Sequence, residues 1–148
     1  MSTSEDTIVE VEEALTGTYM QSARSDRHVL NVDKPLALGG NDAGPGPYES
    51  LLMGLGAFTT MTLRMYAERK NIPLSRVRVR LSRSKVHASD CADCETQDGR
   101  IDEITREIEI EGDLDDQQRQ RLMLIADRCP VHRTLTSETK VRSGMRGS

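Results

Sequence analysis

One segment constrains the fold more than any other. Residues 51–66, L-L-M-G-L-G-A-F-T-T-M-T-L-R-M-Y, place apolar or small side chains on nearly every side of a helix. Pro47 and Glu49 suit the first turn of such a helix, and Asn71 would end it. A helix that is apolar all round belongs inside a protein. We therefore predict a central helix over about residues 47–70 that is buried on every side.

Two glycines stand inside this predicted helix. Gly54 and Gly56 each cost about 1 kcal/mol of helix propensity relative to alanine. The simplest compensation is a close approach by another helix or by backbone. Phe58, the only phenylalanine of the chain, follows them among small residues, and we predict that it is a core side chain.

The segments before the helix predict three short strands, at residues 7–15, 18–23 and 27–33, and then a loop rich in glycine and proline at residues 34–47. These strands and the helix are separate blocks of the chain. There is no regular alternation of strand and helix, which favours an α+β fold with antiparallel pairing.

Two segments after the helix alternate apolar and charged residues. Residues 76–83 carry arginine on the outward side, and residues 103–111 carry glutamate there. Pairing arginine with glutamate across the wet face predicts an antiparallel hairpin. Arg106 falls on the inward side of this hairpin and is unexplained.

The rest of the chain predicts an amphipathic helix at 114–128, a helical turn at 130–136 and a last strand at 138–142. At 148 residues the chain has the size of one domain. We predict a single domain over residues 1–148, with flexible tails at about 1–6 and 143–148.

Composition narrows the class of partner. Charged residues make up 30% of the chain, with both signs interspersed and a net charge of −4. Such a chain lacks the basic surface that nucleic acid or an anionic membrane attracts. It has no signal-like N-terminus and no apolar run of about 18 residues, so we expect a cytoplasmic protein with a small-molecule or protein partner.

Cys129 is the first candidate for chemistry, in the segment I-A-D-R-C-P-V-H-R-T-L. If Pro130 opens a helical segment, the thiol lies at its N-terminal end, near His132 and two arginines. Such surroundings would lower the pKa of the thiol and make it reactive. The alternative is a buried, inert cysteine, since free cysteine is among the most buried residue types.

His87, Cys91 and Cys94 form the second candidate, in the loop of the predicted hairpin. They offer three ligands for Zn²⁺, with Asp90 or Asp93 as a fourth. The same cysteines could form a redox pair, or they could be incidental thiols in a solvated loop. Reduced thiols are the expected ground state, because three cysteines without a secretory leader do not indicate a disulfide framework.

Glu49, beside Tyr48 at the start of the central helix, is the third candidate. Its carboxylate could simply cap the helix. If it is enclosed, it could instead pair with Arg24 or Arg27 from the N-terminal strands and position a substrate.

Four segments resemble the OsmC/Ohr family of osmotically inducible and organic hydroperoxide resistance proteins, and in particular its OsmC-like redox protein branch: G-G-N-D-A-G-P-G-P-Y-E-S-L-L, L-R-M-Y-A-E-R-K, H-A-S-D-C-A-D-C and I-A-D-R-C-P-V-H-R-T-L. The resemblance covers about residues 15–142. It implies an α+β OsmC-like fold in which antiparallel sheets wrap around two central helices. It also implies an intertwined homodimer with sites near the interface.

The chain departs from the family pattern at two positions. Active members reduce an organic hydroperoxide with a peroxidatic cysteine on the first central helix, and a resolving cysteine then forms a disulfide with it. Cys129 matches the resolving position, whereas Phe58 matches the peroxidatic one, and a benzyl group forms no thiolate or sulfenic acid.

The catalytic glutamate of hydroperoxide-resistance members directly follows the proline, where this chain has Tyr48, with Glu49 one residue later. Arg24 and Arg27 are candidates for the family's arginine.

These departures imply a catalytically impaired member of the oxidative stress defence family, which leaves open whether the chain is an enzyme. In this reading Tyr48, Phe58 and Met61 line a site for a small apolar ligand or an organic hydroperoxide. One alternative is an active thiol-dependent peroxidase that uses Cys129 or the Cys91/Cys94 pair with a dithiol reductant. Another is a metal- or redox-responsive dimer that binds a small molecule. No cofactor is expected apart from the zinc alternative.

Overall fold

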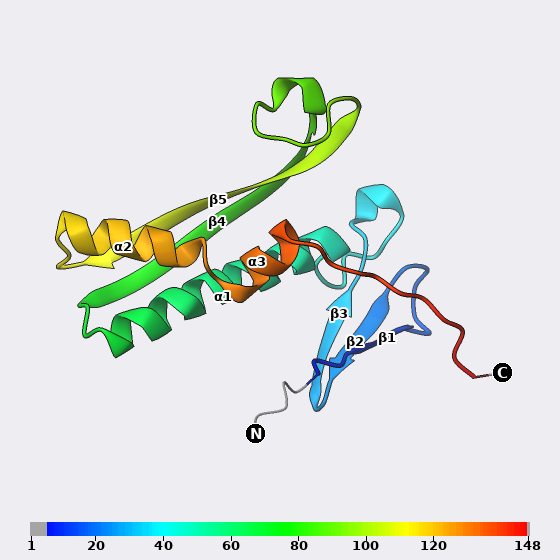
Figure 1. Cartoon of the computed structure of the whole chain (residues 1–148). Coiled ribbons are helices and arrows are strands. Elements are labelled where there is room, and N and C mark those ends of the chain that lie inside the picture. Colours follow the sequence, from blue (N-terminus) through cyan, green and yellow to red (C-terminus); the bar gives the residue numbers. More distant parts are fainter. Residues whose placement is uncertain (1–5, 148) are drawn as a thin grey trace. The chain divides into compact units, whose positions relative to one another are not determined.

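The computed structural model describes residues 6–147, and its internal contacts divide the chain into two compact units, Met1–Leu52 and Met53–Ser148 (Figure 1). Each unit is described by itself, and the single domain over residues 1–148 stays a prediction. The predicted tail at residues 1–6 falls almost wholly outside the described residues. The elements are three helices and two antiparallel sheets, which confirms the α+β class.

The N-terminal unit holds a three-stranded antiparallel meander of β1 (Glu10–Glu13), β2 (Gln21–Ser25) and β3 (His28–Val32). All three predicted strands are present, although β1 is shorter than expected. The unit's described residues include only two buried ones, Asp33 and Gly40. The sheet therefore has no apolar core within its own unit, although a small sheet normally needs a covered face to be stable.

Asp33 organises the loop that follows β3. It is 2% exposed, and its carboxylate accepts the backbone N–H groups of Lys34 at 2.7 Å, Asn41 at 3.2 Å and Ala43 at 3.1 Å. Burial raises the pKa of Asp33, but these three hydrogen bonds outweigh it and hold the pKa below its ordinary value. The predicted loop also contains one short 3₁₀ turn, η1 (Leu36–Leu38).

The long helix α1 (Pro47–Arg69) has nearly its predicted bounds. Asn71 ends it in the left-handed conformation, with φ of 55°. The prediction that it is buried on every side is wrong for the single chain. One face is covered by the rest of the chain, and its buried residues are Leu55, Gly56, Thr59, Leu63, Tyr66 and Ala67. The opposite face is apolar but exposed.

The two glycines of α1 differ in whether another part of the chain approaches them. A Cβ on Gly56 would come 2.8 Å from Cδ1 of Leu81, so the expected close approach exists, although it is made by a strand side chain. A Cβ on Gly54 would meet nothing within 4 Å. The expected neighbour of Gly54 is therefore absent from the described part of this chain, because Gly54 lies on the exposed face.

The predicted hairpin is confirmed and is longer than expected, with β4 (Leu74–His87) pairing antiparallel to β5 (Arg100–Gly112). The register sets three arginines opposite three glutamates: Arg76 and Glu111, Arg78 and Glu109, Arg80 and Glu107. The second and third pairs are exposed ion pairs at 3.9 Å. Exposed pairs of this kind fix register more than they add stability.

Helix α2 (Asp116–Ala126) starts with a capping box between Asp115 and Gln118. Its predicted apolar face packs with α1 on the inward face of the hairpin. The buried core is Leu63, Tyr66, Ala67, Leu74, Leu122 and Ala126. A short helix, α3 (Pro130–Thr136), follows where the helical turn was predicted.

The segment after α3 has no regular structure up to residue 147. The predicted strand at residues 138–142 is therefore wrong. A strand forms only where a neighbouring strand exchanges backbone hydrogen bonds with it. No described strand pairs with this segment. In the part of the chain from residue 6 to 147, no helix combines the length and apolarity needed to cross a membrane.

Candidate functional site

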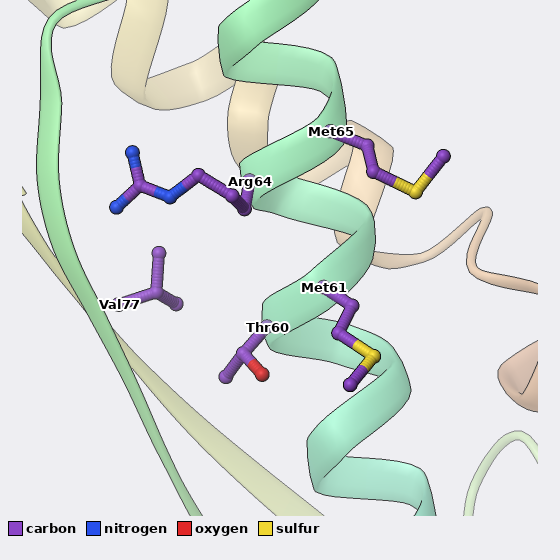
Figure 2. Close-up of a pocket in the computed structure, with 5 residues that line it drawn as sticks. All are labelled: Thr60, Met61, Arg64, Met65 and Val77. Carbon is purple, nitrogen blue, oxygen red and sulfur yellow. The ribbon is translucent and has the colours of Figure 1, made fainter.

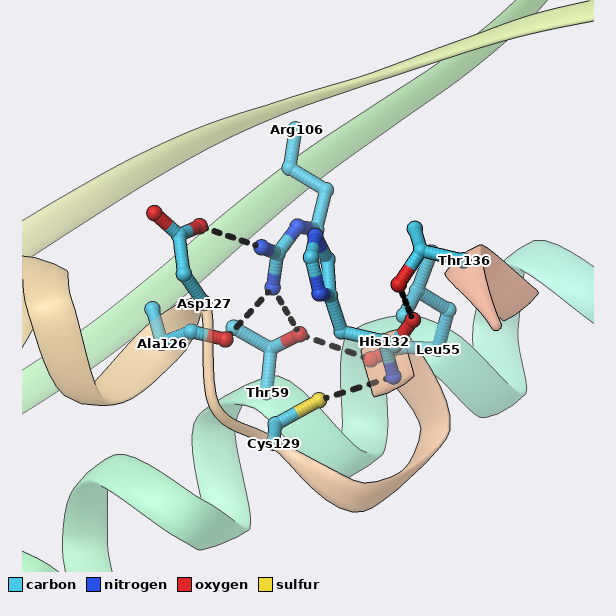
Figure 3. Close-up of polar contacts among 8 residues, drawn as sticks. All are labelled: Leu55, Thr59, Arg106, Ala126, Asp127, Cys129, His132 and Thr136. Atoms are coloured by element: carbon cyan, nitrogen blue, oxygen red, sulfur yellow. Dashed lines mark hydrogen bonds and ion pairs between the residues drawn. The ribbon is translucent and has the colours of Figure 1, made fainter. Parts of the chain in front are cut away.

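A buried arginine ties three elements of the C-terminal unit together (Figure 3). Arg106 lies on the inward face of β5 with 10% of its side chain exposed. Its guanidinium donates to the hydroxyl of Thr59 on α1 at 2.9 Å and to the carbonyl of Ala126, the last residue of α2, at 3.3 Å. It also pairs with Asp127 at 3.1 Å. The planar guanidinium carries several N–H donors, so it can bond several acceptors at once. Its positive charge is also favourable at the C-terminal end of a helix.

This arginine was not identified as a site residue from the sequence, although its signal was present. Arg106 is the only charged residue among the inward positions 104, 106, 108 and 110 of its strand. A charge on an apolar face needs a buried partner. Its partners Thr59 and Asp127 come from segments far away in the sequence, so the pattern of the strand alone could not name them.

A cavity of about 240 Å³ lies beside the arginine. Side chains from α1, β5 and the α3 segment line it: Leu55, Asp102, Ile104, Arg106, His132, Leu135 and Thr136. Nδ1 of His132 is buried and has no hydrogen-bond partner among the described residues. Apolar walls with a few polar groups are typical of small-molecule sites. The cavity thus combines apolar surface with the side chains of Asp102, Arg106, His132 and Thr136.

Fixed charges surround one end of this cavity. Asp102 accepts hydrogen bonds from Arg83 at 2.6 Å and from Lys85 at 3.4 Å. The bond from Arg83, followed by that from Lys85, holds the pKa of Asp102 below its ordinary value. The carboxylate is therefore ionised at neutral pH.

Cys129 lies in the same cluster but is fully buried, with 0% of the residue exposed. It is the N-cap of α3, as the sequence predicted, and its sulfur accepts the backbone N–H of His132 at 3.3 Å (Figure 3). Of the two alternatives for this residue, the structure shows the burial expected of the inert cysteine. An external hydroperoxide has no direct access to a sulfur in this position.

Phe58 was predicted to be a core side chain, and for the single chain this is wrong, because 44% of it is exposed. It lies on the exposed face of α1. The adjacent residue, Thr59, is the one that faces the buried cluster with Arg106. One step along a helix rotates a side chain by about 100°, which explains how neighbours can face solvent and core.

Met61 also lies on the exposed face of α1. It contributes to an open pocket of about 420 Å³ with Thr60, Arg64, Met65 and Val77. Figure 2 shows Met61 and Met65 on one side of the helix, with Thr60 and Arg64 on the side toward Val77 of β4. Arg64 is held there by the carbonyl of Leu74 at 2.6 Å.

The N-terminal candidates lie in the other unit. Glu49 accepts the backbone N–H of Gly46 at 3.0 Å, so its carboxylate caps the start of α1. Arg24 pairs with Glu12 at 3.8 Å rather than with Glu49. Arg27 is exposed in the turn between β2 and β3, and Tyr48 is exposed in the first turn of α1. The catalytic roles of Glu49 and Arg27 and the binding role of Tyr48 stay predictions.

The loop between β4 and β5 corrects two expectations. Cys91 and Cys94 form a disulfide, whereas reduced thiols were expected. Spacing by two residues brings their sulfurs together, so neither residue needs a partner elsewhere. Cys91, Asp93 and Cys94 form a group of potential metal ligands. His87, predicted as the third ligand, is not in that group, because it belongs to the end of β4, where it pairs with Arg100.

Solved structures with the same fold include an OsmC-like protein from Mycoplasma pneumoniae. It is 21% identical, with a TM-score of 0.70 and coverage of 90% of this chain and 89% of that chain. An organic hydroperoxide resistance protein OsmC from Legionella pneumophila has 20% identity, a TM-score of 0.63, and coverage of 91% and 92%. OhrB of Bacillus subtilis has 20% identity, a TM-score of 0.58, and coverage of 89% and 91%. At these identities the likeness shows the fold.

A comparison with curated protein sequences finds no match. The family model described as OsmC-like protein matches residues 39–143, which is more than half of the chain and includes α1, the hairpin, α2 and α3. The chain belongs to the OsmC-like protein family.

Proposed function

We propose that this protein binds an organic hydroperoxide or another small apolar molecule without reducing it. The observation that carries the proposal is Phe58, which stands where the resemblance places the attacking thiol of active members. Several structural neighbours are named organic hydroperoxide resistance proteins, which supports this class of ligand. A phenyl ring has no acidic proton and no lone pair with which to attack a peroxide oxygen.

The remaining thiol of this unit supports the same conclusion. Cys129 is fully buried, and its sulfur already accepts a hydrogen bond from His132. A resolving cysteine attacks a sulfenic acid, and Phe58 cannot form one. With no sulfur at position 58, Cys129 has no partner for the two-cysteine cycle.

The cavity beside Arg106 is our proposed binding position. Leu55, Ile104 and Leu135 would contact the apolar part of the ligand, and the imidazole of His132 would hydrogen-bond its polar end. A neutral imidazole nitrogen accepts a hydrogen bond from a hydroperoxide or hydroxyl O–H. No metal or other cofactor is needed for such binding.

A second copy of this chain is the partner that we propose for the exposed face of α1. This face carries Met53, Phe58, Met61 and Met65, all exposed. Gly54 lies among them with open space around it and costs helix stability without a neighbour in the chain. A face of this kind that packs against its own copy explains both features. We place this homodimer in the cytoplasm, with each chain as one domain.

A turnover assay tests the proposed function. Protein is mixed with cumene hydroperoxide and a dithiol reductant, and loss of hydroperoxide is followed. We expect the rate of the buffer control. Steady turnover above that rate would overturn the proposal.

One alternative enzyme has a specific observation in its favour, because Cys91 and Cys94 already form a disulfide in a solvent-accessible loop. If turnover is found, Cys91→Ser and Cys129→Ser separate the two thiol sources. Loss of turnover in Cys91→Ser alone would assign a peroxidase activity to the loop. Loss in Cys129→Ser alone would assign it to the buried thiol.

A further inference from the structure

The loop that joins β4 to β5 has a feature that the proposed function does not use. Between Ala88 and Gly99 it contains four acidic residues and no lysine or arginine. The N–H of Ala88 donates to the carbonyl of Gly99 at 2.8 Å, and Ala88 itself is buried. The loop is therefore an acidic surface element with a closed and anchored base.

Three potential ligand atoms converge in this loop. The sulfurs of Cys91 and Cys94 and a carboxylate oxygen of Asp93 all lie within 4.8 Å of one another. The sulfur of Cys91 is 3.2 Å from Oδ1 of Asp93. Both cysteines are half-buried and Asp93 is exposed, so solutes can reach the group from solvent.

The chemistry of the three side chains suits a divalent cation. Two cysteine sulfurs and a carboxylate are ligands that zinc accepts. In the structure the two sulfurs form a disulfide, and in that form neither sulfur is available as a thiolate ligand.

We propose that this loop is a redox-gated site for a thiophilic divalent cation such as Zn²⁺, bound by Cys91, Asp93 and Cys94 with water as the fourth ligand. An external dithiol opens the gate. Two electrons and two protons pass to the cysteine sulfurs, the S–S bond breaks, and the dithiol leaves as its own disulfide. The cation then binds, and both thiol protons go to solvent. An external disulfide closes the gate by taking back the two electrons, which removes both thiolate ligands.

The backbone of the loop suits both forms. The Cα atoms of Cys91 and Cys94 are 5.5 Å apart. Two sulfurs bound to one tetrahedral zinc are about 3.8 Å apart, given Zn–S bonds of about 2.3 Å. Rotation of the two side chains is therefore enough to change from disulfide to metal ligands. Asp93, predicted from the sequence as a possible fourth ligand, is in this group, whereas His87 is not.

Cobalt titration of the full chain tests this site without reference to hydroperoxide chemistry. Protein reduced with a dithiol and desalted without oxygen is compared with the oxidised form, and the thiolate-to-cobalt absorption band is recorded. We expect one Co²⁺ per chain in the reduced protein and none in the oxidised protein. Zn²⁺ should displace the cobalt and protect two thiols from alkylation.

Variants assign the ligands. Cys91→Ser and Cys94→Ser should abolish tight binding. Asp93→Asn should weaken it at least about tenfold, since changing a residue that only hydrogen-bonds a metal ligand already costs about that much. His87→Ala and Asp90→Asn are matched controls in the same loop region, and Cys129→Ser is the buried-thiol control. All three should bind like the wild type. Absence of the band in reduced wild type, equal binding by the oxidised form, or loss of binding in His87→Ala would overturn the proposal.

Discussion

Arg106 is the single residue whose side chain ties three segments of the C-terminal unit together through polar contacts. It joins α1 through Thr59, the end of α2 through Ala126, and the following turn through Asp127. Its position in the sequence is unusual, since it is a charged residue among the apolar inward positions of its strand. The sequence could not show which groups its side chain binds. Phe58 is the opposite case. Comparison with the family pattern identified Phe58 as the substituted peroxidatic position. Within one chain, however, it is simply an exposed apolar side chain on α1.

Replacing Arg106 should be costly. We expect Arg106→Met to lower the free energy of unfolding by about 1–3 kcal/mol, because buried acceptors on Thr59 and Ala126 lose their donor. Arg106→Lys should recover only part of this, since an ammonium group cannot reproduce the fork of donors. Urea denaturation measures both. Arg78→Met, on the exposed face of the same hairpin, is the control and should stay within about 0.5 kcal/mol. An equal loss in both methionine variants would contradict the role given to Arg106.

Asp33 should make the stability of the folded protein depend on pH. Its folded pKa lies below the unfolded value of about 3.9, so its ionised form stabilises the folded protein. That contribution is present above about pH 4 and is lost as the pH falls through the folded pKa. Asp33→Asn should therefore be less stable than wild type at pH 6, and the difference should narrow toward pH 3.

Thermal or urea unfolding across this range checks the Asp33 prediction. Asp26→Asn, in the exposed turn between β2 and β3, is measured in parallel as the exposed-carboxylate control. A difference between wild type and Asp33→Asn that stays constant from pH 6 to pH 3 would rule out the carboxylate as its source.

At the scale of elements, local patterns predicted the hairpin, the three helical segments and the three N-terminal strands. The Arg–Glu alternation of β4 and β5 also correctly predicted that arginine lies opposite glutamate, because side chains of a strand alternate with a period of two. The pattern failed where an element depends on a partner. The strand at residues 138–142 has no described neighbour, and α1 is covered on one face only. The periodicity of a sequence indicates which side chains are buried. It does not indicate whether the residues that bury them belong to the same chain.

The contact between α1 and β4 gives a prediction at this scale. Gly56→Ala should gain about 1 kcal/mol of helix propensity but lose most of it to the collision with Leu81. In a Leu81→Ala background the collision is removed, so the same change should be stabilising. The double-mutant cycle should therefore show a coupling of about 1 kcal/mol. Additive effects in urea denaturation would mean that Leu81 does not explain this glycine.

At the scale of the whole molecule, the chain leaves much apolar surface without cover. The N-terminal meander has no apolar core within its unit, and α1 exposes Phe58 and three methionines on one face. From the sequence we predicted a helix that is apolar all round, and the resemblance implied a homodimer. Neither predicted which face of α1 stays exposed in the single chain, because a pattern within one chain does not encode surface that the proposed second copy would contribute.

The proposed homodimer can be tested through this face. Met61→Lys combined with Met65→Lys should weaken association at least tenfold, about 1.4 kcal/mol, because two charges would be buried against an apolar partner surface. Size-exclusion chromatography with light scattering should give a dimer for wild type and a monomer for the double variant. Met123→Lys, an exposed methionine on α2, should remain a dimer. A monomeric wild type would contradict the proposal.

Hydroperoxide consumption by wild type and Phe58→Cys, measured side by side with a dithiol reductant, tests the central claim most directly. The account predicts that wild type matches the buffer control, because no thiol is present at position 58. It predicts that Phe58→Cys exceeds that rate at least tenfold, a change of about 1.4 kcal/mol in activation free energy, since Cys129 stands at the position that the resemblance gives to the resolving cysteine. A wild type that consumes hydroperoxide as fast as Phe58→Cys would contradict the account.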